Sequence, residues 1–87
     1  MTWKDISYLL GSPLSRKVLK TLEKDTLAPV QMAEKAKLDK GNVSKKLSEL
    51  TKRGLVECMN PDSRKWRFYK ITDKGRKTLK EVERVKP

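Results

Sequence analysis

The spacing of the apolar residues changes at Gly54, and this change restricts the fold more than any other feature of the sequence. Before Gly54, apolar residues recur at intervals of three and four, which is the pattern of helices that bury one face. After it, residues 55–59 and 66–71 resemble strands, and the second run is rich in aromatic and β-branched side chains. Residues 60–63, Asn-Pro-Asp-Ser, are typical of a turn. The chain is therefore expected to place a β-hairpin after a group of helices.

The first two helices are marked by their start signals. Residues 2–10 have an amphipathic pattern in which Thr2 and Asp5 resemble a capping box. Ser12-Pro13 is a second start signal, because a side-chain cap precedes a proline at the first helical position. The helix that begins there is expected to run to about Lys24.

A second pair of helices is expected between residues 29 and 53. Pro29 can open the first of them, and Leu27 just before it can form a short strand. Asp39 is a good N-cap for the other, which has a narrow apolar stripe and should end at Gly54. The members of that stripe are Val43, Leu47 and Leu50. Two short helices joined by a tight turn form a helix-turn-helix signature.

The hairpin is followed by one more helix. Thr72 can cap it, and Asp73 favours its first turn. Gly75 costs about 1 kcal/mol relative to alanine in a helix, so its expected gain is close approach of the backbone to the core. At 87 residues the chain is expected to form one domain, residues 1–87, with a helical extension at 1–11 and the last helix at 73–87.

Charge restricts the partners of this domain. The chain has 22 Lys and Arg residues against 11 Asp and Glu residues, a net charge of +11. Such a surface attracts polyanions, of which nucleic acid is the first candidate and an anionic membrane the second. A lysine-rich surface that only improves solubility is the alternative.

Several classes of function are disfavoured by what the sequence lacks. It has no histidine, the commonest general base and metal ligand, and no phosphate-binding glycine loop, so neither an enzyme nor a cofactor is expected. Cys58 is the single cysteine, which favours an intracellular, reducing compartment and hence the cytoplasm. No apolar run approaches the roughly 18 residues needed to span a bilayer, so no membrane partner is expected.

The positive charge is concentrated in two segments. Residues 40–53 carry five Lys or Arg against one acid, beside the apolar stripe of that helix. The hairpin segment 60–70 carries Arg64, Lys65, Arg67 and Lys70 against Asp62. A helix fits the major groove of B-DNA, about 12 Å wide, and a basic hairpin tip can enter the minor groove or bind phosphates. The alternatives are an ordinary amphipathic surface helix and a charged hairpin edge that prevents strand pairing.

The order helix, helix, turn, helix, hairpin, helix resembles that of the winged helix-turn-helix regulators, especially small archaeal ones with MarR-like or ArsR-like cores. Five stretches carry the resemblance, in the right order, over about residues 12–80. They are residues 12–19, 31–36, 42–50, 52–57 and 69–76. The resemblance implies an α+β fold with a three-helix core, a two-stranded hairpin as the wing, and short terminal helices.

The resemblance also implies which residues contact DNA. Five residues of the 39–53 helix would face the major groove: Lys40, Gly41, Asn42, Lys45 and Lys46. Three others would meet phosphates: Gln31, Lys35 and Ser44. Arg64, Lys65 and Arg67 would serve the wing, residues 60–67. In this arrangement Asn42 could pair with adenine, and Lys45 or Lys46 could reach guanine. The alternative for Asn42 is a helix-start residue that caps its own backbone.

The sequence departs from these families at two places. It lacks the cysteine cluster of metal sensors, and the long flanking helices are reduced to residues 2–10 and 73–85. Both terminal segments nevertheless keep apolar residues that could join two subunits, which predicts a homodimer. These residues are Trp3, Ile6, Leu10, Val82 and Val85. The alternative is that they pack on their own domain.

Three functions remain after these exclusions. The leading hypothesis is a transcription regulator that binds double-stranded DNA sequence-specifically as a two-fold dimer. The others are a non-specific architectural DNA-binding protein and a protein-interaction module of the transcription machinery. The hairpin aromatics, Trp66, Phe68 and Tyr69, could also stack on single strands, although such residues more often belong to the hairpin core. Strand alternation predicts Tyr69 and Ile71 on the inner face and Phe68 on the outer face.

Overall fold

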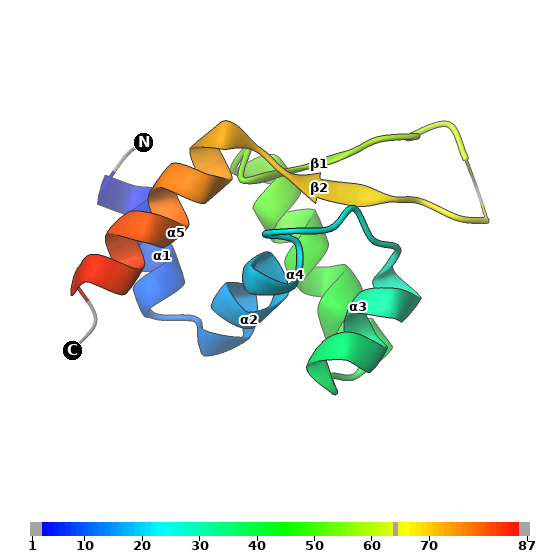
Figure 1. The fold of residues 1–87 in the computed structure, drawn as a ribbon, viewed down its shortest axis with the longest axis horizontal. Helices are drawn as coiled ribbons and strands as arrows, with labels where there is room; N and C mark the ends of the chain where they lie inside the picture. The colour runs from blue at the N-terminus through cyan, green and yellow to red at the C-terminus, as the bar shows by residue number, and fades with distance from the viewer. Residues whose placement is uncertain (1–2, 64, 86–87) are drawn as a thin grey trace.

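The computed structural model describes residues 3–63 and 65–85, which form five helices and a two-stranded hairpin. The elements are α1 (Trp3–Leu10), α2 (Pro13–Thr21), α3 (Pro29–Ala36), α4 (Lys40–Lys52), β1 (Val56–Cys58), β2 (Tyr69–Ile71) and α5 (Asp73–Val85). The hairpin projects from one end of the molecule, and the described termini lie at the opposite end (Figure 1). The molecule is accordingly elongated, with principal extents of 37 × 24 × 20 Å.

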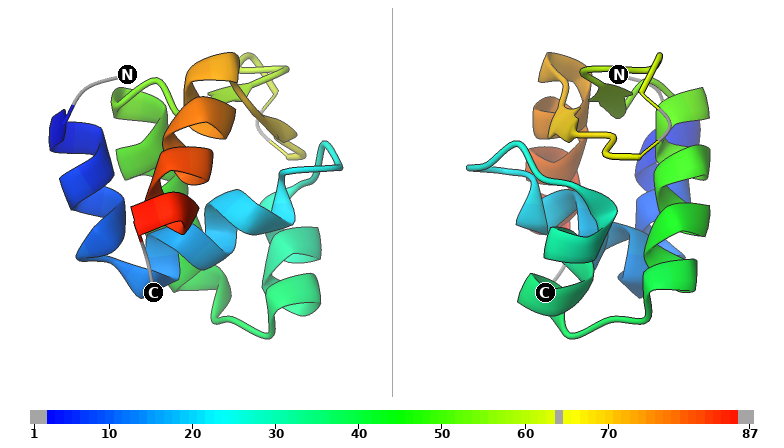
Figure 2. Two further views of the ribbon diagram at one scale, coloured as in Figure 1. Left: turned by 60° about the vertical axis from the view of Figure 1, so that its left-hand side comes forward. Right: turned by 90° about the vertical axis from the view of Figure 1, so that its right-hand side faces the viewer.

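The core lies where α2, α3 and α4 meet, and α1 and α5 pack side by side over one end of it (Figure 2). The apolar stripes predicted from the sequence are buried here. Val43, Leu47 and Leu50 of α4 are at most 1% exposed, and Met32 of α3 is fully buried. Burying these side chains stabilises the helices, since helices of this length are marginal in isolation.

Side chains close the helix ends as the sequence predicts. Asp39 Oδ2 accepts the backbone N–H of Asn42 at 3.2 Å, and Thr72 Oγ1 accepts that of Gly75 at 2.9 Å. Helix α2 ends at Thr21, earlier than the predicted Lys24, because its last turn tightens. The Leu22 N–H bonds to the Leu19 carbonyl three residues back, at 3.1 Å, rather than four residues back.

Two glycines meet backbone requirements. Gly54 ends the α4 segment with φ of +74°, a conformation that side chains rarely adopt. Gly75 lies so close to the residue that precedes β1 that a Cβ atom would collide with the Leu55 carbonyl oxygen. The close approach predicted for Gly75 is confirmed. The predicted capping box at Thr2 lies outside the described residues.

The hairpin is antiparallel, and its paired strands are shorter than predicted. Val56 pairs with Ile71 and Cys58 with Tyr69, and the Met59 N–H donates one further backbone bond to the Phe68 carbonyl at 2.7 Å before a side chain takes over. Asn60 Oδ1 accepts the Phe68 N–H at 2.8 Å, and Asn60 Nδ2 donates to the Trp66 carbonyl at 2.6 Å. The Asn60 side chain thus takes the place of a strand partner and carries the hairpin outward without regular pairing.

Leu27 extends the hairpin by one bridge. Its N–H donates to the Tyr69 carbonyl at 3.0 Å, and the Tyr69 N–H donates back at 2.8 Å. The predicted strand residue at Leu27 is therefore confirmed. Ile71 is buried, as alternation predicts, whereas Phe68 and Tyr69 are both half-buried. Trp66 is the hairpin aromatic that faces solvent, with 54% of its surface exposed.

The terminal apolar residues divide into two groups. Ile6 is 8% exposed and Val82 is fully buried, and both belong to the core of this chain. The expectation that they are available to a second subunit is therefore wrong, because α1 and α5 bury their facing sides against each other and against α2. Trp3 and Val85 remain exposed, at 71% and 56%.

Candidate nucleic-acid interface

Helix α4 presents a polar, basic face to solvent. At 3.6 residues per turn, the side of the helix opposite Val43, Leu47 and Leu50 carries Gly41, Lys45, Ser48 and Lys52. All four of these residues are exposed. Because the core holds the apolar side, the basic side can meet a partner without rearrangement of the helix.

A groove runs between α4 and the hairpin, and residues at the start of α3 also line it. It has a volume of about 920 Å³. Lys40 and Lys52 line it from α4, and Lys65 and Arg67 line it from the hairpin. No acidic residue is found among the described residues that line it. The groove therefore concentrates positive potential between two walls, as a site for an anionic chain requires.

Hydroxyl groups complete the α4 wall of this groove. Ser44, Ser48 and Thr51 line it in the same row as Lys40. Thr51 Oγ1 donates its single proton to the Leu47 carbonyl at 2.7 Å, so the hydroxyl donors that this wall can offer are those of Ser44 and Ser48. Hydroxyls and ammonium groups together are the donors that proteins use for phosphate oxygens.

Four of the eleven predicted contact residues meet in the groove: Lys40, Ser44, Lys65 and Arg67. Gly41 and Lys45 lie beside it on the outward side of α4. Asn42 is exposed and gives its backbone N–H to the Asp39 cap. Arg64 lies outside the described residues. The contacts assigned to all of these residues stay predictions.

Three predicted residues lie away from the groove. Lys46 is on the α1 side of α4, where its Nζ is 3.6 Å from Glu49 Oε1 and its side chain is only 21% exposed. Gln31 Oε1 accepts the Ala28 N–H at 2.9 Å and so caps α3. Lys35 Nζ pairs with Asp25 Oδ2 at 2.7 Å. Two ion pairs and a helix cap thus hold three side chains that the sequence predicts to contact DNA.

Sequence reasoning missed four residues of the groove: Ser48, Thr51, Lys52 and Trp66. For the three on α4 the signal was present. Steps of four residues from Lys40 lead through Ser44 to Ser48 and Lys52, along one side of the helix. Trp66 is absent only from the predicted duplex contacts, because the sequence names it among three hairpin aromatics that could stack on single strands. Strand alternation alone could not separate the exposed aromatic from the half-buried ones.

The side of α4 away from the groove is fixed by a polar cluster. The Tyr8 hydroxyl of α1 donates to Glu49 Oε1 at 2.7 Å, and the Arg53 guanidinium lies 3.9 Å from the centre of the Tyr8 ring. The Asp5 carboxylate forms ion pairs with Arg53 Nη1 at 3.4 Å and with Lys74 Nζ at 3.3 Å, and its side chain is only 6% exposed. The cluster therefore joins α4 to α1 and α5.

These contacts shift two pKa values in the cluster. The hydrogen bond from Tyr8, together with the nearby lysines, lowers the pKa of Glu49 below its usual value of 4.5. Burial is the main cause that raises the pKa of Tyr8 above 10.0. Both shifts keep the cluster in one state at neutral pH, with a carboxylate that accepts and a phenol that donates.

The described part of the chain holds no group of three or more His, Cys, Asp or Glu residues arranged to bind a metal ion. Cys58 is half-buried and lines the groove, with Sγ 4.0 Å from Asn60 Oδ1. None of the helices described is both long enough and apolar enough to cross a bilayer.

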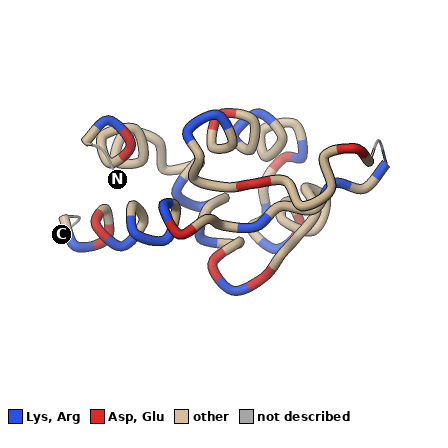
Figure 3. Tube along the Cα trace, turned by 90° about the horizontal axis from the view of Figure 1, so that it is seen from above, with Lys and Arg blue, Asp and Glu red and all other residues tan. Residues whose placement is uncertain are grey.

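The positive charge is not confined to the groove. Figure 3 shows Lys and Arg on α4, on the hairpin and along α5 as well. On α5, however, basic residues alternate with Asp73, Glu81 and Glu83. One face of α5 also ties back to α2, because Lys20 Nζ lies 2.8 Å from Glu83 Oε2. The groove differs from α5 because two elements, α4 and the hairpin, supply its basic side chains. No acidic residue is among its described lining residues.

A sequence model described as winged helix-turn-helix matches residues 14–87. The chain belongs to the winged helix-turn-helix family. In this family's terms, α3 and α4 form the helix-turn-helix and residues 60–67 lie in the wing. The fold predicted from the sequence, an α+β winged helix-turn-helix, is thereby confirmed. No curated protein sequence matches the chain.

Solved structures share the winged helix-turn-helix fold of this chain. MarR of E. coli in its apo form has a TM-score of 0.78 at 23% identity, over 94% of this chain and 62% of that chain. BldR of Sulfolobus solfataricus has a TM-score of 0.77 at 25% identity, over 94% and 63%. ZitR of Lactococcus lactis, solved in complex with DNA, has a TM-score of 0.71 at 20% identity, over 84% and 51%. The chain thus spans about three fifths or less of the length of these proteins.

Proposed function

We propose that this chain binds double-stranded DNA and regulates transcription, without catalysing a reaction. Helix α4 enters the major groove, and the wing, residues 60–67, contacts the minor groove or the phosphate backbone. One observation carries the proposal: the groove between α4 and the hairpin has four basic residues and no acid among the described residues that line it. The structures of ZitR with DNA and of a MarR mutant with operator DNA support it by likeness of fold.

The dimensions of duplex DNA fit this arrangement. A helix with its side chains is about 10–12 Å across, and the major groove is about 12 Å wide. A ridge of phosphates separates the major groove from the minor groove. If α4 lies in the major groove and the wing in the minor groove, this phosphate backbone would lie between α4 and the hairpin of the protein. Lys40, Lys52, Lys65 and Arg67 would then meet its phosphates from both sides.

Base recognition is assigned to the outward side of α4. Lys45 is exposed beside the groove, whereas Lys46 is held by Glu49 on the other side of the helix. Lys45 is therefore the stronger candidate for guanine O6 and N7. Asn42 uses its backbone, not its side chain, at the Asp39 cap, which supports adenine recognition by the exposed amide.

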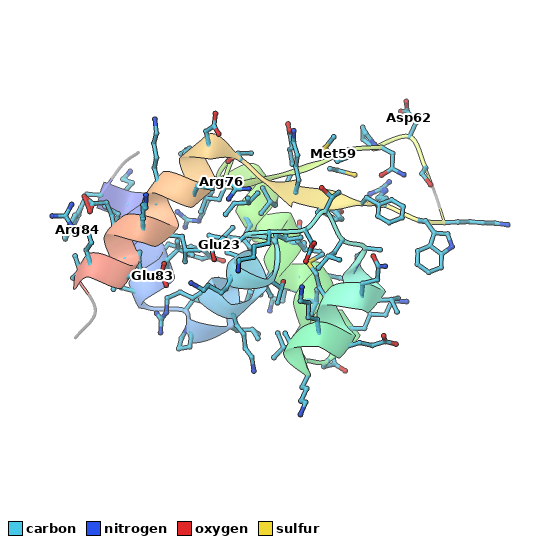
Figure 4. All side chains as sticks on the ribbon, viewed as in Figure 1. Glu23, Met59, Asp62, Arg76, Glu83 and Arg84 are labelled. Atoms are coloured by element: carbon cyan, nitrogen blue, oxygen red, sulfur yellow. The ribbon has the colours of Figure 1, made fainter. Side chains whose placement is uncertain are left out.

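We also propose that the DNA-bound form is a two-fold dimer inside the cell. Trp3 and Val85 are exposed and Leu10 is half-buried, all on α1 and α5 at the end away from the wing. Figure 4 shows the separation, with Arg84 near the close of α5 and Met59 and Asp62 out on the hairpin. A dimer formed there leaves both wings free. The two α4 helices should then read half-sites about 10–10.5 bp apart.

A non-specific architectural role is the second candidate, because basic residues also lie along α5 (Figure 3). Selection of bound duplexes from a random pool separates the two candidates. The proposal expects a consensus with two half-sites, bound roughly a thousand-fold or more tightly than random duplex at physiological salt. Equal affinity for selected and random duplexes, with a steep loss of both at high salt, would instead establish the architectural role.

A further inference from the structure

The wing carries one large apolar side chain that the fold leaves uncovered. Trp66 is 54% exposed, although tryptophan has the largest side chain of any residue. It lines the groove that faces α4, between Lys65 and Arg67. An exposed indole flanked by two cations suits a partner that offers negative charge and a flat, apolar surface at the same place.

The backbone around Trp66 is held in place before any partner arrives. Asn60 Nδ2 donates to the Trp66 carbonyl at 2.6 Å, and the Trp66 N–H donates to Ser63 Oγ at 3.3 Å. Arg67 Nε also donates to the Ser63 carbonyl at 3.0 Å. These bonds span the turn and order the backbone that carries the indole. Because this backbone is ordered before binding, a contact made by Trp66 costs less conformational entropy.

The rest of the groove indicates the chemistry of the partner. Opposite the hairpin, the α4 wall offers the hydroxyls of Ser44 and Ser48 together with Lys40. A lipid surface would favour more apolar side chains around the indole than this wall supplies. A strand of DNA offers both negative charge and flat apolar surfaces, because its phosphates alternate with deoxyribose rings and with bases whose faces are apolar.

We propose that Trp66 packs its indole against a deoxyribose or base at the minor-groove edge of duplex DNA, next to the phosphates held by Lys65 and Arg67. This inference rests on the proposed DNA binding and adds a contact that is apolar rather than ionic. Apolar side chains that enter the minor groove partly unstack base steps and bend the duplex. Trp66 thereby favours sites with flexible pyrimidine–purine steps under the wing.

Intrinsic fluorescence tests this contact directly, because the chain has two tryptophans at opposite ends. Trp3 lies at the start of α1, at the end of the molecule away from the hairpin (Figure 1). Trp3→Phe leaves Trp66 as the only indole, and Trp66→Phe leaves Trp3. Each protein is titrated with the selected duplex and with one of its strands, while anisotropy of labelled DNA reports binding independently. The expected result is strong quenching of Trp66 emission by the duplex and little change in Trp3 emission.

Affinity and its salt dependence supply the second readout. Trp66→Ala should weaken duplex binding roughly ten-fold and leave the slope of log affinity against log salt unchanged. Lys65→Ala should weaken binding and lower that slope by about 1. Duplex binding by anisotropy with unchanged Trp66 emission and undiminished Trp66→Ala affinity would overturn the inference and leave the DNA proposal standing. Stronger quenching by the single strand than by the duplex would also overturn it. Absence of anisotropy change with any DNA would overturn the proposed function itself.

Discussion

The hydroxyl of Tyr8 donates a 2.7 Å hydrogen bond to Glu49 Oε1, which joins the N-terminal helix α1 to the proposed DNA-reading helix α4. Arg53, at the end of the same α4 segment, stacks on the Tyr8 ring and reaches Asp5, one turn earlier in α1. Contacts at Glu49 and at Arg53 thus hold helix α4 on the side opposite the groove. Its orientation depends on these polar contacts as well as on its apolar stripe.

Replacing Tyr8 with phenylalanine removes the hydrogen bond to Glu49 and a second one to Ser15 Oγ, also at 2.7 Å, and keeps the ring that Arg53 covers. The free energy of unfolding should fall by about 2 kcal/mol, at about 1 kcal/mol for each partly buried hydrogen bond. Urea denaturation followed by circular dichroism measures the change. Ser7→Ala, an exposed site on the same helix, is the control and should leave the midpoint where it is. An equal loss in both variants would show that the Tyr8 hydroxyl makes no special contribution.

The same contact predicts a dependence of stability on pH. The pKa of Glu49 is lower in the folded protein than its usual 4.5, so the folded state favours the carboxylate. This stabilisation is present above pH 4.5 and is lost as the pH falls through the lowered pKa. The free energy of unfolding, measured from neutral pH down to acid pH, should fall less in Glu49→Gln than in the parent protein. Glu34→Gln, an exposed site on α3, should retain the parent's profile; identical profiles for all three proteins would refute the assignment.

Asp5 should be the most sensitive acidic residue of the chain. Its side chain is only 6% exposed and meets both Arg53 and Lys74. Asp5→Asn keeps the shape but leaves two cations facing a neutral group. Because Arg53 and Lys74 are 36% and 39% exposed, the cost should be about 2 kcal/mol, below that of a pair buried on both sides. Asp62→Asn, exposed on the hairpin, should cost almost nothing. Denaturant midpoints for the two variants that differ by less than the error of the measurement would contradict this ranking.

Gly75→Ala should destabilise the chain although alanine is the better helix former. The added methyl group meets the Leu55 carbonyl and the Ile71 side chain, so α5 must shift away from the hairpin. Overpacking of this kind costs about 1–3 kcal/mol, more than the gain of about 1 kcal/mol in helix propensity. Gly11→Ala, where the added methyl group has only ordinary contacts, is the matched control. A thermal melt with unchanged midpoint for Gly75→Ala would contradict the packing described here.

The fold follows from the sequence largely because its signals are local. Asp39, Gly54 and Thr72 each act on the backbone within a few residues, so the helix ends they set could be predicted. What could not be predicted depends on packing between distant segments. Nothing local distinguishes Ile6, which is buried, from Trp3, which is exposed, until α5 is placed beside α1.

The candidate site shows the same division. The basic side of α4 could be predicted from helical spacing, and so could the basic hairpin. The groove between them depends on the position of the hairpin relative to α4. The Asn60 side chain contributes to that position through its bonds to the Trp66 carbonyl and the Phe68 N–H. Ion pairs across the fold decide which lysines remain available. Lys35 turns to Asp25, ten residues earlier in the chain, and Lys46 turns to Glu49, which Tyr8 also holds.

If the outward side of α4 reads duplex DNA, Lys45→Ala combined with Lys52→Ala, two exposed residues on that side, should abolish the reading. Affinity for the selected duplex is measured by anisotropy for the parent, this double variant and Lys77→Ala with Lys80→Ala on α5, which removes the same charge elsewhere. The α4 variant should lose its preference for the selected duplex and keep its melting midpoint, while the α5 variant should keep the preference. Unaltered affinity and preference in a folded α4 variant would show that this side of the helix does not read DNA.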